Sequence, residues 1–269
     1  MTRTLVLCAD DFAQSAPISE GILRLLAQRR LSAVSVMSGA PLWPDLAPEL
    51  AAFAGRADIG LHFNLTEAFD GEPAPHGLNG LLLASSLRLL SVGTLRQLCL
   101  EQIDDFRKYA GQLPDFIDGH QHVHALPQVR QALFEAIALR WPDGRRPYLR
   151  APDLLGTSAD DWLKYLVLRV TCGGFTGQAR RRGLPVAPWF GGMYSFASDA
   201  DYSGLMERWL ALAPAQGLLM CHPGLPSSGS GDPIARQRVR EFDYLRSDAF
   251  GDALARHGVQ LGRLAGAIA

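Results

Sequence analysis

The 269-residue sequence predicts an α/β fold, a closed or nearly closed (β/α) barrel of seven or eight parallel strands. Short apolar runs alternate along the chain with longer amphipathic stretches, the order expected when crossover helices join the strands of a parallel sheet. The number of these units in a chain of this length favours a TIM-like barrel over an open sheet. Distortion or incomplete closure of the barrel is left open.

Eight apolar runs are the expected strands, and the last of them is the weakest. Between them, residues 16–30, 96–113 and 127–141 carry apolar side chains three and four positions apart, which indicates helices. We expect one domain over residues 1–269. The expected strands are Leu5–Ala9, Ala33–Met37, Ile59–Phe63, Phe116–His122, Tyr148–Arg150, Leu184–Ala187, Leu218–Cys221 and Val259–Leu261.

Two segments that follow expected strands look irregular: residues 67–80, which are rich in Gly and Pro, and residues 222–233. Either one is a lid over a site or a passive surface loop. We expect the first to begin a lid insertion that covers residues 67–100. Its apolar part, 78–90, is expected to be buried on its own barrel rather than to contact a lipid or a second subunit.

Charge and cysteine content exclude several function classes. The 26 basic and 27 acidic residues nearly balance, so no global attraction to nucleic acid or to an anionic membrane is expected. The four cysteines form no CxxC pair, which argues against a zinc ribbon or a redox dithiol. The first residues do not resemble a signal peptide, and no apolar run is long enough for stable membrane insertion. We expect a cytoplasmic protein with reduced thiols.

Ionisable side chains stand at the carboxyl ends of several expected strands. In a parallel barrel these ends meet at one face, where the loops build active sites. Each residue also has a structural explanation: a helix cap, a core histidine, a loop hydrogen bond or an ion pair. Their shared position nevertheless predicts one site. The residues are Asp10, Asp11, His62, His120, Arg150 and His222.

The stretch IDGHQHVHALP, residues 117–127, places three histidines at alternate positions behind an aspartate. If it is extended, Asp118, His120, His122 and His124 share one face of a strand. A metal ion is the most economical common partner for so many imidazoles. The alternative is a strand end held by hydrogen bonds, and the spacing alone does not choose which histidines would be ligands.

Seven motifs, spread nearly from end to end, resemble the YdjC-like (ChbG/HpnK-type) carbohydrate deacetylases. At the position after ADDF, where that family usually has Gly, this chain has Ala13, which places a methyl group near the site. The motifs are ADDFAQS, SAVSVMSGAPLWP, DIGLHFNLTE, DFIDGHQHVHALPQVR, RAPD, MCHPG and REFDYLRSDAF.

The resemblance implies one divalent metal ion held by Asp11, His62 and His120. Two imidazoles and one carboxylate favour Zn²⁺, with Mg²⁺ or another divalent ion left open. His122 and His124 then lie behind the ligands or face the substrate.

By the same resemblance, Asp10 is the expected general base and Asp118 the reserve candidate. His222 is the expected general acid, cationic near neutral pH if a carboxylate supports it. Arg150 is expected to hold that carboxylate, either Asp153 or Asp10.

The implied reaction removes the N-acetyl group of an amino sugar, of the chitooligosaccharide or glycosyl-lipid type. A metal-dependent hydrolase of another amide or of a phosphoester, and a non-catalytic sugar-binding protein, remain as alternatives. A homodimer is the default assembly. Candidates for sugar contact, because rings stack on sugars and amides pair with hydroxyls, are Trp43, Phe63, Asn64, Trp189 and Tyr194.

Overall fold

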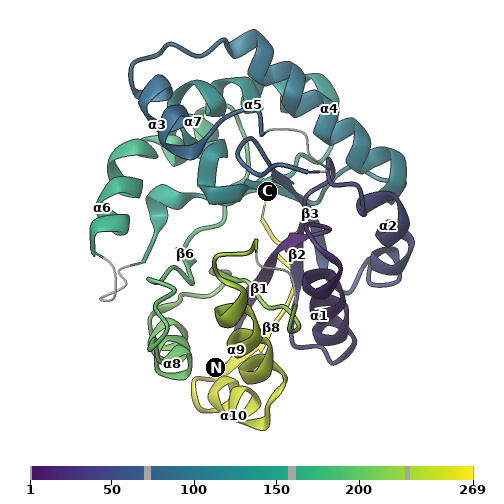
Figure 1. Cartoon of the computed structure of the whole chain (residues 1–269), viewed down its shortest axis with the longest axis vertical. Coiled ribbons are helices and arrows are strands. Elements are labelled where there is room, and N and C mark those ends of the chain that lie inside the picture. The colour runs from purple at the N-terminus through teal and green to yellow at the C-terminus, as the bar shows by residue number, and fades with distance from the viewer. Residues whose placement is uncertain (1, 70–73, 157–161, 228–230, 269) are drawn as a thin grey trace.

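The computed structural model of the chain describes residues 2–69, 74–156, 162–227 and 231–268 (Figure 1). A curled sheet of parallel strands runs in the order β5-β4-β3-β2-β1-β7-β6, and β8 pairs with the start of β1. The prediction of a parallel α/β barrel is confirmed. The strands are β1 (Arg3–Phe12), β2 (Ala33–Val36), β3 (Asp58–Phe63), β4 (Phe116–Gly119), β5 (Tyr148–Leu149), β6 (Phe190–Gly191), β7 (Leu218–Cys221) and β8 (Val259–Leu261).

The barrel is incompletely closed between β5 and β6. Within the described residues, these two strands are connected through isolated bridges, from Leu149 to Val186 and from Leu155 to Phe190. The predicted strand Leu184–Ala187 is shortened to a single bridge at Val186, where Leu149 of β5 donates to the Pro185 carbonyl at 2.9 Å and accepts from the Ala187 N–H at 3.0 Å, and β6 lies a few residues later. Pro185 and Pro188 keep the ladder short, because proline has no N–H to donate to a sheet.

Helices cover the outside of the sheet, and their ends follow local sequence signals (Figure 1). In α4, the Ser91 side chain accepts a hydrogen bond from the backbone N–H of Thr94 at 3.2 Å, and the helix ends at Gly111 with a positive φ of 72°. The helices are α1 (Ala16–Ala27), α2 (Trp43–Ala51), α3 (Leu78–Ser86), α4 (Val92–Ala110), α5 (Pro127–Arg140), α6 (Trp162–Thr171), α7 (Phe175–Arg181), α8 (Tyr202–Leu212), α9 (Ala235–Arg246) and α10 (Asp248–Arg256).

The segment predicted as a lid contains more than a loop. Residues 70–73 lie outside the described part, 78–86 form α3, and 92–100 begin α4, which packs against α5. Burial of the apolar stretch 78–90 is only partial: Leu81 is buried, whereas Leu83, Leu87 and Leu89 are exposed. None of the helices in the described ranges has an apolar stretch long enough to cross a membrane.

The residues after β4 do not continue the strand. β4 ends at Gly119, and residues 120–125 form a short 3-10 segment in which Gln121 and His122 have positive φ values of 51° and 61°. The prediction that Asp118, His120, His122 and His124 share one strand face is therefore wrong. The turn sends these side chains to separate neighbours.

The carboxyl-terminal segment folds back onto the end of the barrel where the strands begin. There the buried Asp58 carboxylate accepts hydrogen bonds from the backbone N–H groups of Leu264 and Ala265, at 2.7 and 3.0 Å, and from the Tyr148 hydroxyl at 3.1 Å. Arg263 adds an ion pair at 2.8 Å. One buried side chain thus attaches the end of the chain to the base of the sheet.

Candidate functional site

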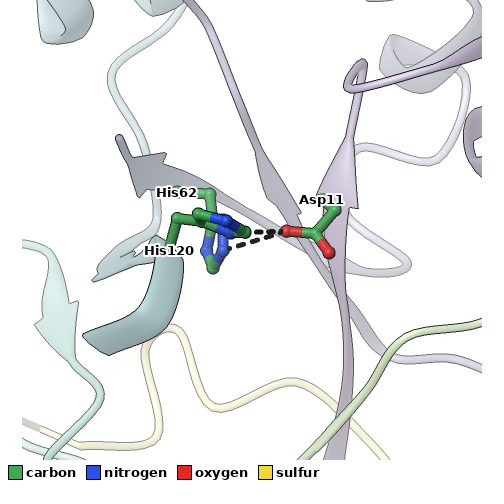
Figure 2. A group of neighbouring side chains, drawn as sticks. All are labelled: Asp11, His62 and His120. Carbon is green, nitrogen blue, oxygen red and sulfur yellow. Dashed lines mark hydrogen bonds and ion pairs between the residues drawn. The ribbon is translucent and has the colours of Figure 1, made fainter. Parts of the chain in front are cut away.

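Three of the predicted residues, Asp11, His62 and His120, form a triad in which both imidazoles approach one oxygen of the Asp11 carboxylate. His62 Nε2 lies 3.3 Å and His120 Nδ1 3.1 Å from Asp11 Oδ1. The three ligand atoms all lie within 4.8 Å of one another. Figure 2 shows both imidazoles directed at the carboxylate, although the side chains come from β1, β3 and the segment after β4. Two imidazole nitrogens and a carboxylate oxygen form a donor set suited to a divalent ion.

An irregularity in β1 places Asp11 in this position. The pairing of β1 with β2 shifts register between Ala9 and Phe12, and Asp11 has a φ of 68°. The backbone of Ala13 is also strained, with a φ of 74°. Its N–H donates to Ser19 Oγ at 3.0 Å, which holds this conformation. Glycine tolerates such a φ without the clash of a Cβ atom, which fits the family preference for Gly at this position.

His62 is oriented from behind. Its Nδ1 lies 2.7 Å from Asp118 Oδ1 and 3.1 Å from Ser35 Oγ, so Nε2 faces Asp11. Burial lowers the pKa of His62, but the Asp118 and Asp10 carboxylates outweigh burial and raise it to about 10. A cation bound at Nε2 needs the neutral ring and would displace that proton. A carboxylate behind a ligating imidazole is the usual device for fixing its orientation.

Arg150 neutralises the carboxylates beneath the triad. Its guanidinium donates to both oxygens of Asp10 at 2.6 Å and lies 2.6 Å from Asp118 Oδ2, with the whole side chain buried. Burial raises the pKa of Asp10, but Arg150 more than offsets this and holds it well below its usual range. Cys8 Sγ, 3.3 Å from Arg150, joins Asp10 and Asp118 in a second potential ligand group. In this second group the Arg150 guanidinium already supplies the positive charge that a metal ion would bring.

His222 lies beside Asp10, with Nε2 3.8 Å from Asp10 Oδ2. Burial lowers the pKa of His222 to about 4. The Asp10 and Asp11 carboxylates act to raise this pKa, whereas Arg238 and Arg150 lower it further. In this state burial thus opposes the cationic ring expected near neutral pH, although a carboxylate lies beside it. Of the two carboxylates considered for Arg150, the structure selects Asp10, because Asp153 instead accepts a hydrogen bond from the backbone N–H of Thr176 at 3.0 Å.

The other two histidines of the motif lie outside the triad. His124 is buried, and its Nε2 lies 2.9 Å from the Arg150 carbonyl oxygen. His122 packs edge-on against Phe190, with ring centroids 5.3 Å apart, and lines the cavity described below. Asn64 is occupied with its own loop, where its side chain bonds the backbone of Thr66 and Glu67.

Two residues of α9, for which the sequence suggested no role, contact the site. Arg238 Nη2 donates to Asp11 Oδ2 at 2.8 Å, which leaves Oδ1 facing the imidazoles. Glu241 accepts hydrogen bonds from the backbone N–H of His222 at 2.6 Å and from the Tyr194 hydroxyl at 2.8 Å. Both are buried at helical spacing on a face that also carries Gln237, Phe242 and Leu245, and charged residues interleaved with apolar ones along one helix face are a signal that a sequence can show.

The site opens into a cavity of about 520 Å³. Of the five residues predicted to contact sugar, only Tyr194 is among its described lining residues. Glu67 also lines it, with Oε2 3.8 Å from His120 Nε2. The polar triad lies at one part of this cavity, and leucine and valine side chains of α3 and α6 line another.

Comparisons with known proteins show which proteins this chain is similar to. The mouse (Mus musculus) protein named carbohydrate deacetylase is 29% identical over 96% of this chain and 92% of its own length. Its human (Homo sapiens) counterpart is 30% identical over 96% and 88%. A chitooligosaccharide deacetylase of Yersinia pestis (strain Pestoides F) is 27% identical over 97% and 98%.

Among solved structures, a protein of Enterococcus faecalis V583 provisionally assigned to cellobiose-phosphate cleavage has the same fold. It superposes with a TM-score of 0.72 at 17% identity over 98% of both chains. The model of the YdjC-like protein family matches residues 4–256. The resemblance predicted from the motifs is thereby confirmed, and the chain belongs to the YdjC-like protein family.

Proposed function

We propose that the protein is a metal-dependent hydrolase that removes the acetyl group from an N-acetylated amino sugar. The observation that carries the proposal is the convergence of Asp11, His62 and His120 at the wall of a cavity, beside the Asp10–Arg150 pair. The carbohydrate and chitooligosaccharide deacetylases among its relatives support the same substrate class.

The donor atoms of the triad fit a divalent ion. Asp11 Oδ1, His62 Nε2 and His120 Nδ1 face one another, while Asp118 and Arg238 hold two of these side chains from outside. An ion held there would polarise an amide carbonyl and lower the pKa of a water molecule. The two imidazoles favour Zn²⁺.

Asp10 is the proposed general base. Arg150 donates to both of its oxygens and keeps it ionised at neutral pH. The low pKa makes it a weak base, so the pKa of the attacking water has to be lowered before Asp10 can take its proton, and Asp10 then passes that proton on readily. Asp118 is less suitable, because Asp10 lines the cavity whereas Asp118 is not among its described lining residues.

His222 is the proposed proton donor to the departing amine. Since its ring is neutral in this state, it has to receive a proton first, and Asp10 Oδ2 is 3.8 Å from its Nε2. We therefore propose a relay in which the proton taken up by Asp10 moves to His222 and then to the amine nitrogen. Glu241 holds the backbone of His222 in place for this transfer.

Acetate release from N-acetylated chitooligosaccharides tests the proposal. Activity should disappear with a chelator and return with Zn²⁺, and His62→Ala should lose both metal and activity. His257→Ala is the matched control, because His257 pairs with Glu207 at 2.6 Å before β8, at the other end of the barrel. Acetate release that is unchanged by the chelator would contradict the proposed role of the metal ion. Phosphoester turnover without acetate release, or sugar binding without turnover, would establish one of the alternatives.

A further inference from the structure

Exposed apolar side chains are concentrated on two segments of the described chain. Ten large apolar side chains in these residues are exposed, and eight of them fall within 83–89 and 162–170. Trp162 and Val170 reach exposed fractions of 71% and 73%. Scattered single cases such as Leu139 and Leu212 are ordinary, but a cluster of this size usually has a partner.

Helix α6 is apolar on both of its faces. Tyr165 and Leu168 pack against the core of the protein. The opposite side carries apolar residues at helical spacing, and all of them are exposed. Lys164 and Arg169 are the only charged residues in the sequence of this helix, and an apolar helix face is normally covered. The exposed residues are Trp162, Leu163, Leu166, Val167 and Val170.

This outer face continues into the cavity of the proposed active site. Leu163 and Val167 belong to the exposed face and also line the cavity, together with Leu78 and Leu82 of α3. Figure 1 shows α3 and α6 on the same side of the molecule. A ligand resting on this face would therefore meet the cavity mouth directly.

The charge of this region differs from that of the whole chain. From Trp162 to Ser198 the sequence has five basic residues and no acidic one, whereas the net charge of the chain is −1. Arg169, Arg180, Arg181 and Arg182 are exposed. Asp160 and Asp161, which precede this stretch, lie outside the described residues. The overall balance of charges thus conceals a basic segment that carries the apolar face.

We propose that the exposed face of α6 docks on the surface of an anionic lipid bilayer. Apolar side chains would enter the interfacial layer while the arginines pair with anionic headgroups. A second copy of the chain fits less well, since a two-fold contact through this face would oppose two basic segments. The proposal is independent of the reaction proposed above.

Cosedimentation with vesicles tests this docking. The wild-type protein should bind vesicles of equimolar phosphatidylcholine and phosphatidylglycerol, bind pure phosphatidylcholine weakly, and dissociate as salt is added. Arg169→Gln should weaken binding about fivefold, the effect of one basic residue near such a surface. Tryptophan emission should shift to the blue on binding, and Trp162→Phe should remove most of that shift.

The double variant Trp162→Ser/Val170→Ser should lose binding, while Leu139→Ser/Leu212→Ser should keep it. The second pair is a matched control, because these leucines are 55% and 57% exposed on other helices. Circular dichroism checks that both variants fold. Equal binding by the two double variants, or equal binding to both kinds of vesicle, overturns the proposal. A wild-type dimer that only the first variant converts to monomer would instead identify this face as a contact between copies.

Discussion

Replacing Arg150 with methionine tests how the buried charges of the site are balanced. The guanidinium is fully buried and makes three contacts of 2.6 Å with the Asp10 and Asp118 carboxylates. Methionine fills much of the same volume but carries no charge. His62 remains beside Asp118, so the carboxylate left without its main counter-charge is Asp10.

The structure sets the size of the expected effect. Breaking a buried ion pair by removing one partner costs about 3–5 kcal/mol. For a protein of this size each kcal/mol lowers Tm by about 2–4 °C, so Arg150→Met should melt about 6–20 °C below the wild type. Arg140→Met is the control, because Arg140 binds Asp104 through two similar contacts of 2.6 and 2.5 Å on the surface. Its cost should be about 0–1 kcal/mol.

The effect should also depend on pH. In the wild type the pKa of Asp10 is lowered, so its stabilising contribution is present above the unfolded pKa of about 4 and is lost only as pH falls through the folded pKa. In Arg150→Met, burial instead raises this pKa, so the variant loses stability as pH rises above about 4. The gap between the two proteins should widen toward neutral pH.

Thermal melting in the presence of chelator, at several pH values, measures both quantities. Chelator keeps any bound ion from altering the comparison. If Arg150→Met melts as high as Arg140→Met, the guanidinium does not neutralise the buried carboxylates and the assignment of Asp10 as an ionised base loses its support. A gap that narrows toward neutral pH would contradict the sign derived for Asp10.

Three further predictions concern His62, Asp58 and Glu241. His62→Ala should weaken Zn²⁺ binding more than the 10- to 100-fold typical of an outer residue, whereas His257→Ala should leave the calorimetric affinity unchanged. Asp58→Asn should cost about 1–3 kcal/mol in urea unfolding and speed hydrogen exchange at the Leu264 amide; normal protection there would argue against the attachment at Asp58. Burial raises the pKa of Glu241 to about 7, so its ionisation should destabilise the fold as pH rises from about 4.5 to 7. Stability of Glu241→Gln should therefore vary less than that of the wild type over this range, and an equal slope would contradict the raised pKa.

Much of the fold could be predicted because it follows from local pattern. Alternating apolar runs and amphipathic stretches identified the strands near Leu5, Ala33, Ile59 and Leu218 within a few residues of their bounds. The prediction was too long at 184–187, where prolines leave a single bridge at Val186, and it was wrong after Gly119, where the chain turns. A period-two pattern of side chains cannot reveal a turn made by two residues with positive φ.

The sequence by itself determined which residues could meet: strand-end carboxylates, imidazoles and Arg150, brought to one face because parallel strands end together. Only the tertiary structure decided how they pair. Arg150 joins Asp10 and Asp118, Arg238 joins Asp11, and a bulge in β1 turns Asp11 toward two imidazoles. These choices depend on contacts of 2.6–3.3 Å between side chains that lie tens to hundreds of residues apart in the sequence, and no local pattern of residues encodes such distances.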